Sequence, residues 1–297
     1  MADWSPPLCT LLVLALFFLI AWKLRKLLED RNWREAVFQR AFARDVIGES
    51  RFHWKIYSYD VLLVFRCIAS IFCVCIWFDV AYRTDFGFYR AYTCWNFTLI
   101  TLFFLSGTKQ SIRAHQGHHN ACWHDKLHLI SGNILVTTTF IVTAVVWMVL
   151  YPNLSRVDPE EANAKFLSLD SIAQHILNLV LVQFDFFLST MPIVQENVIF
   201  VLLFVITYGI MFVIDWFVDG YAVYPFLSLD HSLASVFLLG LFFLHALLFK
   251  LSVWVSTIKM KAVESRAPLA PKSGASYGEL DSDNLIENNR NPVNREA

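Results

Sequence analysis

Several polar side chains interrupt the apolar stretches of this 297-residue sequence. Charged and strongly polar groups are costly to place in an apolar helix, so they are functional candidates by default. They are Arg66, Thr93, Asn96, Thr98, His175, Asn178, Asp185, Asp215, His245 and Lys250. The set contains hydroxyl, imidazole, amide and charged groups, which suit either proton-transfer chemistry or buried ion pairs.

Thr93 and His175 provide the two groups that nucleophilic acyl transfer requires. An imidazole can take the proton of a hydroxyl while that hydroxyl attacks an ester carbonyl. With a rise of about 1.5 Å per residue, Thr93 and His175 lie about 6 Å and about 5 Å below one membrane boundary. Asn96 or Asn178 would then donate to the oxyanion. The alternative is structural, because Thr often bonds its own helix backbone and His a neighbouring helix.

Arg66 and Asp185 are opposite charges expected in the same half of the membrane. His175, Asn178 and Asp185 lie at i, i+3 and i+10 of one apolar run, which places them on one helix face. That face should point into the bundle. We therefore predict a structural ion pair between Arg66 and Asp185 that fixes helix packing.

A histidine-rich loop offers a second chemistry. It contains an H-x-x-H-H box and an H-x-x-x-H box, made by His115, His118, His119, His124 and His128. Imidazole ligates both iron and zinc, and these boxes resemble those of membrane desaturases and hydroxylases. That resemblance implies a further box near the C-terminus, which this sequence lacks. We therefore expect no cofactor, and a metal-binding membrane oxidoreductase stays an alternative.

Seven apolar runs must position these residues. The chain is 57% hydrophobic and 16% charged, which is too apolar for a single core in water. A membrane-spanning helix needs about 20 apolar residues. Runs near that length cover residues 8–24, 61–82, 89–107, 129–151, 172–190, 197–219 and 231–257. The sequence predicts an all-α polytopic transmembrane bundle with seven spans, one N-terminal anchor plus a six-helix core.

The distribution of Lys and Arg predicts the orientation of the spans. Basic residues gather in 23–55, in 109–126 and from Lys259 onward, whereas alternate loops carry Asp85 and Asp158. In the first run the basic residues follow the apolar stretch, which favours an anchor over a signal peptide. We expect the N-terminus outside or in a lumen and the C-terminus in the cytosol, at the plasma membrane or an endomembrane.

Composition divides the chain into three parts. Residues 1–58 hold the anchor and a basic cytosolic segment, 59–261 form the core, and 262–297 read as a disordered cytosolic tail. Within the tail, 277–280 and 281–286 resemble sorting signals, so trafficking adaptors are candidate partners. The net charge of −1 argues against a nucleic-acid partner.

Three segments carry a resemblance to a known family. They are residues 89–105, residues 174–178 leading to 187–192, and residues 224–230. In order and spacing they resemble the Rolling stone-like membrane proteins, which look like distant relatives of the androgen-induced transmembrane hydrolases. Those hydrolases cleave fatty acid esters of hydroxy fatty acids with a membrane-embedded Thr and His. Carried over by motif, that pair is Thr93 and His175.

The resemblance covers about residues 59–259 and implies a hydrolase of membrane lipid esters. The chain departs from the hydrolases in its first span, the basic segment before Tyr59, the histidine-rich loop and the tail. Rolling stone itself is associated with myoblast fusion, so a non-catalytic role in adhesion, fusion or scaffolding is the other alternative. A G-protein-coupled receptor is disfavoured, because the third run ends at Lys109 without an acidic-Arg-aromatic triplet.

Overall fold

The computed structural model describes residues 5–30, 58–85, 87–116, 123–220, 222–230 and 233–264, and every regular element within them is helical. The α-helices are α1 (Ser5–Glu29), α3 (Ser58–Arg83), α4 (Tyr92–His115), α5 (Trp123–Val145), α6 (Tyr151–Val157), α7 (Pro159–Phe166), α8 (Leu169–Ile172), α9 (Asn178–Leu188), α10 (Val198–Asp219) and α11 (Ala234–Glu264). Short 3₁₀ turns are η1 (Gly87–Arg90), η4 (Gln195–Asn197) and η5 (Pro225–Leu227), and π turns are η2 (Val146–Leu150) and η3 (Ala173–Leu177).

Six helical segments in the described residues are long and apolar enough to cross a membrane. They are Pro6–Glu29, Val61–Arg83, Trp123–Val157, Leu169–Leu188, Gln195–Asp219 and Ala234–Ala262. Each reaches the length of about 20 residues that a bilayer core requires. The prediction of an all-α, multi-pass integral membrane protein is therefore confirmed.

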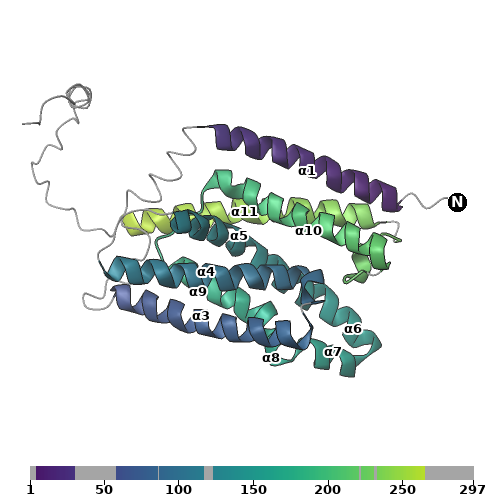
Figure 1. Ribbon diagram of the computed structural model, residues 1–297, viewed down its shortest axis with the longest axis horizontal. Coiled ribbons are helices and arrows are strands. Elements are labelled where there is room, and N and C mark those ends of the chain that lie inside the picture. The colour runs from purple at the N-terminus through teal and green to yellow at the C-terminus, as the bar shows by residue number, and fades with distance from the viewer. Residues whose placement is uncertain are drawn as a thin grey trace, which may run out of the picture.

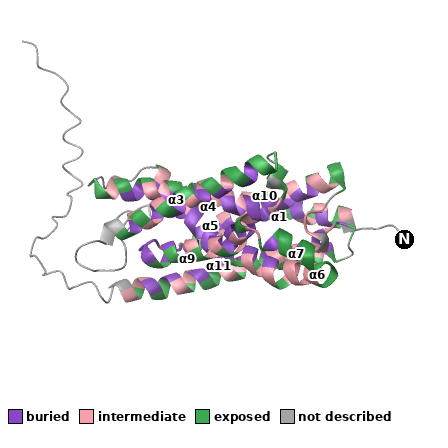
Figure 2. Cartoon of the chain, turned by 90° about the horizontal axis from the view of Figure 1, so that it is seen from below, coloured by how far each residue is buried: buried purple, intermediate pink, exposed green. Residues whose placement is uncertain are grey.

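The predicted count of seven spans is not confirmed, because α4 is not one of these six segments. It has 24 residues, and it is the least apolar of the long helices. Half of its residues are buried, and it packs against α3 and α5. Figure 2 shows buried residues concentrated on α4 and α5, in the interior of the bundle. A helix enclosed by other helices tolerates polar residues that a lipid-facing helix excludes.

The long helices lie side by side and alternate in direction (Figure 1). One end of the bundle carries α6 and α7 and is called the α7 end below. Both α4 and α8 begin at this end, so α4 and α9 run in the same direction. The first helix, α1, packs on α10 and α11 along the outside of the bundle.

Two of the spans contain a π-helical turn. The turn η2 continues α5 into α6, and η3 lies between α8 and α9. A π turn inserts an extra residue into the helical ladder, and such turns occur often at functional sites. Both turns lie toward the α7 end.

Helix boundaries extend beyond some of the predicted runs. The fourth run continues through α6 to Val157, and the next helix, α7, begins at Pro159. Asp158 separates them as an N-cap, since its carboxylate accepts from the backbone N–H of Glu161 at 2.8 Å. The predicted basic segment at 31–57, most of the tail, His118, His119 and His231 lie outside the described residues.

Candidate functional site

A cavity of about 740 Å³ lies at the α7 end of the bundle. Thr93, in the first turn of α4, and His175, in the π turn η3, both line it. The other walls come from η2, α6, α7 and the loop before η5. The structure thus brings the predicted hydroxyl and imidazole to one cavity.

His175 lines the cavity, and one of its ring nitrogens has no hydrogen-bond partner among the described residues. This atom, Nδ1, is buried. The nearest ring is that of Phe166, with 6.3 Å between centroids. In a neutral imidazole protonated at Nε2, such an Nδ1 atom can accept a proton.

Thr93 differs from the other threonines of α4. Thr98 and Thr101 donate to the carbonyl four residues earlier, at 2.8 and 2.9 Å. The side chain of Thr93 lines the cavity together with that of Tyr224, which comes from the loop between α10 and α11.

Ser171 provides a second buried hydroxyl at the cavity. Its Oγ atom has no partner within the described part of the chain, and the residue lies one turn before His175. Nearby, the Cys94 thiol donates to Oε1 of Gln174 at 3.5 Å. Buried polar atoms without a protein partner commonly serve water or a ligand, so the cavity is suited to a polar group.

A smaller apolar pocket of about 80 Å³ adjoins the cavity. The two spaces share Thr93, Val146, Tyr224 and Phe226 in their linings. The rest of the pocket is formed by aliphatic and aromatic residues of α5, α10 and α11, together with His245. Thr93 therefore stands where a mixed polar cavity meets an apolar one.

His245 is tied to the pocket wall by two contacts. Its Nε2 atom lies 3.1 Å from the Tyr92 hydroxyl, and its Nδ1 atom lies 2.7 Å from the carbonyl of Leu241. Both ring nitrogens are thus occupied. This arrangement gives His245 a packing role, in contrast to His175.

Asn96 and Asn178, the predicted oxyanion donors, do not line the cavity. Oδ1 of Asn96 accepts from Thr138 at 2.6 Å, and Oδ1 of Asn178 lies 2.5 Å from the backbone nitrogen of Leu179. Their Nδ2 atoms are buried and have no partner among the described residues. The structure does not bring these amides to Thr93 and His175.

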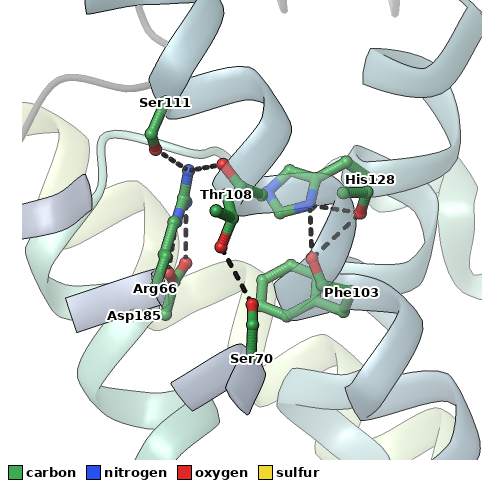
Figure 3. A network of polar contacts seen from close by, with 9 residues as sticks. Arg66, Ser70, Phe103, Thr108, Ser111, His128 and Asp185 are labelled. Atoms are coloured by element: carbon green, nitrogen blue, oxygen red, sulfur yellow. Dashed lines mark hydrogen bonds and ion pairs between the residues drawn. The ribbon is translucent and has the colours of Figure 1, made fainter. Parts of the chain in front are cut away.

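Arg66 and Asp185 form a buried two-point ion pair between α3 and α9. The distances are 2.7 Å from Nε to Oδ1 and 3.0 Å from Nη2 to Oδ2. Arg66 also donates to the carbonyl of Gly107 at 3.3 Å and to Ser111 Oγ at 3.1 Å, both on α4 (Figure 3). The pair therefore joins three helices, and none of these residues lines the cavity.

The described part of the histidine-rich loop does not assemble a metal site. His128 is buried, stacked on Phe103, with its Nδ1 atom 3.2 Å from the carbonyl of Phe103 (Figure 3). His124 instead stacks on Trp123. Within the described ranges, no three His, Cys, Asp or Glu side chains gather closely enough to hold a metal ion.

Sequence reasoning did not identify three residues that the structure brings forward. Lys259, which was interpreted as the exit from the membrane, is buried, and its ammonium donates to the carbonyls of Phe186, Ser189 and Met191 at 2.8, 3.3 and 2.9 Å. Asn133 of α5 binds the same connection between α9 and α10. Its side chain donates to the Pro192 carbonyl at 3.0 Å and accepts from the Val194 N–H at 2.8 Å.

The third missed residue is Tyr224, which lines the cavity together with Thr93. It belongs to a loop, where helical periodicity gives no information about contacts.

Comparison with known proteins adds no assignment. A scan against protein-family models, a search of curated proteins and a search of solved structures each found no match to this chain.

Proposed function

We propose that the protein hydrolyses lipid esters, with Thr93 as the nucleophile and His175 as the general base. One observation carries the proposal: Thr93 and His175 line the same cavity. The Nδ1 atom of His175 has no hydrogen-bond partner among the described residues. The adjoining apolar pocket supports a lipid as the source of the ester, because an ester at Thr93 would have apolar space beside it.

The reaction requires two displacements at the ester carbon. In the first, the Thr93 Oγ atom bonds to the carbonyl carbon while His175 takes the hydroxyl proton. The C–O bond to the alcohol then breaks, and His175 returns that proton to the departing oxygen. In the second, a water molecule attacks the acyl-threonine with the help of His175, and the acid leaves as the Thr93 hydroxyl is restored.

We further propose that α4 is a seventh span, surrounded by the other helices. Its 24 residues correspond to about 36 Å, which exceeds the hydrocarbon thickness of about 30 Å. Alternation of the helices then places the α7 end outside or in a lumen, and the substrate would enter from that leaflet. Arg83 and Arg90 are basic residues at this end, where the positive-inside rule expects few. Each of them is paired with an aspartate.

Sided labelling tests this topology. We expect single cysteines at Asp85 and Asp158 to react with an impermeant maleimide from the outer or lumenal face of sealed membranes. A cysteine at Glu196, which is exposed between α9 and α10, should react only from the other face. If all three positions were labelled from the same face, the proposal of seven spans would be wrong.

The catalytic proposal is tested with purified protein and a series of fatty-ester substrates. Thr93→Ala and His175→Ala should each abolish turnover above the uncatalysed rate, while Ser171→Ala should retain it. Ser171 is the matched control, because it is a second hydroxyl on the same cavity. If Ser171→Ala lost turnover and Thr93→Ala retained it, the nucleophile would be Ser171 and not Thr93. Equal rates in the parent and all three variants would leave a non-catalytic role in adhesion, fusion or scaffolding.

A further inference from the structure

We propose that Tyr224 is a further catalytic residue, which donates a hydrogen bond to the ester carbonyl oxygen as that oxygen becomes an oxyanion. The inference rests on the proposed hydrolysis at Thr93. Acyl transfer needs a donor beside the nucleophile, because negative charge develops on the carbonyl oxygen during attack. Neither asparagine predicted for this role lines the cavity.

The position of Tyr224 suits this role. It lines both the cavity and the apolar pocket, as Thr93 does. Its hydroxyl accepts from the backbone N–H of Tyr92, the residue that precedes Thr93, at 3.1 Å. An ester held at the Thr93 Oγ atom would therefore have its carbonyl oxygen close to the phenol.

Two local features restrain the backbone near Tyr224. α10 ends at Gly220 in a left-handed conformation, with φ of 66°, which favours glycine. On the other side, the N–H of Leu227 donates to the Tyr224 carbonyl at 2.9 Å. An anchored donor needs little rearrangement when charge develops, which is how a preformed oxyanion site accelerates a reaction.

The hydrogen bonds of the Tyr224 hydroxyl leave its proton available. The backbone N–H of Tyr92 donates to the phenol oxygen at 3.1 Å. This N–H belongs to the first turn of α4, where backbone donors have no partner within the helix. A phenol has one proton and two lone pairs, so it can accept from Tyr92 and still donate. Burial raises the pKa of Tyr224 above its ordinary value, so the phenol stays protonated at neutral pH.

Tyr224→Phe tests the inference, because it removes the hydroxyl and keeps the ring. Loss of one oxyanion donor typically lowers kcat by about 10²–10³-fold, and we expect that loss with little change in KM. The matched control is Tyr151→Phe, which should keep the parental rate. The Tyr151 hydroxyl donates to Asn163 Oδ1 at 3.0 Å and does not line the cavity.

Inhibitor binding provides a second readout that does not depend on turnover. A phosphonate that mimics the tetrahedral intermediate should bind Tyr224→Phe more weakly by about the same factor as the loss in kcat/KM. An amide analogue of the ground state should bind both proteins equally. A variant that had merely lost its fold would lose both ligands.

The outcomes separate this inference from the proposed function. Suppose that Tyr224→Phe turns over substrate at the parental rate while Thr93→Ala does not. That result would overturn the role of Tyr224 and leave the proposed hydrolase in place. Equal weakening of both inhibitors would also overturn it, because Tyr224 would then be a structural residue. Equal rates in the parent and Thr93→Ala would overturn the hydrolase and the donor together.

Discussion

Arg66→Met should destabilise the protein strongly, because it removes the cation from a buried ion pair. The exposed fraction is 1% for Arg66 and 0% for Asp185. The substitution would leave the Asp185 carboxylate without the two bonds of 2.7 and 3.0 Å that satisfy it. Removing one partner of a buried pair typically costs about 3–5 kcal/mol. We expect a loss of that size in the free energy of unfolding, measured reversibly in mixed micelles.

A double-mutant cycle tests the cause of that loss. Combining Arg66→Met with Asp185→Leu removes both charges, and apolar replacements of a buried pair are often close to neutral. The double variant should therefore be more stable than either single variant. Arg25→Met is the matched control, because Arg25 forms an exposed pair with Glu29 on α1 at 2.9 Å. We expect no measurable loss there.

Two results would refute this reasoning. A loss for Arg66→Met no larger than that for Arg25→Met would mean that water solvates Asp185 within the bundle. Additive losses in the double variant would mean that the two side chains are not coupled.

The remaining predictions concern two further buried contacts. Lys259→Met leaves three buried carbonyls without their donor, so the free energy of unfolding should fall by more than about 2 kcal/mol. Lys250→Met, at an exposed position of the same helix, should cause no loss. Gly107→Ala places a methyl group 2.7 Å from His128 Cε1 and 3.2 Å from Arg66 Nε, and should cost about 1–3 kcal/mol in the same assay. Gly240→Ala is its control, because no atom lies within 4 Å of the added methyl group, and an equal loss there would contradict the packing argument.

Residues within long helices were the part of the site that sequence could predict. Hydropathy gives the ends of each run, the helical rise gives depth, and alternation of spans gives the side of entry. These three quantities place Thr93 and His175 together without knowledge of any contact. They do not give the extent of the cavity along a helix. Asn96 and Asn178 lie three residues, about 4.5 Å of helical rise, beyond Thr93 and His175 and do not line the cavity.

Residues in connections were not predictable by the same route. Tyr224 follows the end of α10 in a loop without periodicity, so sequence gives neither its depth nor its direction. The buried contacts of Lys259 were not predictable either, because a lysine after an apolar run usually indicates only the membrane boundary. Here α9 ends at Leu188, and the following connection turns back among the helices, where the ammonium binds its carbonyls.

Hydrogen bonding separates the structural polar residues of this bundle from those of the cavity. Arg66 and Lys259 are enclosed by partners, and a ligand would have to displace those bonds to reach them. Other buried atoms in the described residues lack a partner, but those of His175 and Ser171 belong to residues that line the cavity at the α7 end. Because a polar atom without a partner can contribute to chemistry only where a substrate can reach it, these contacts direct the search for a reaction to the α7 end.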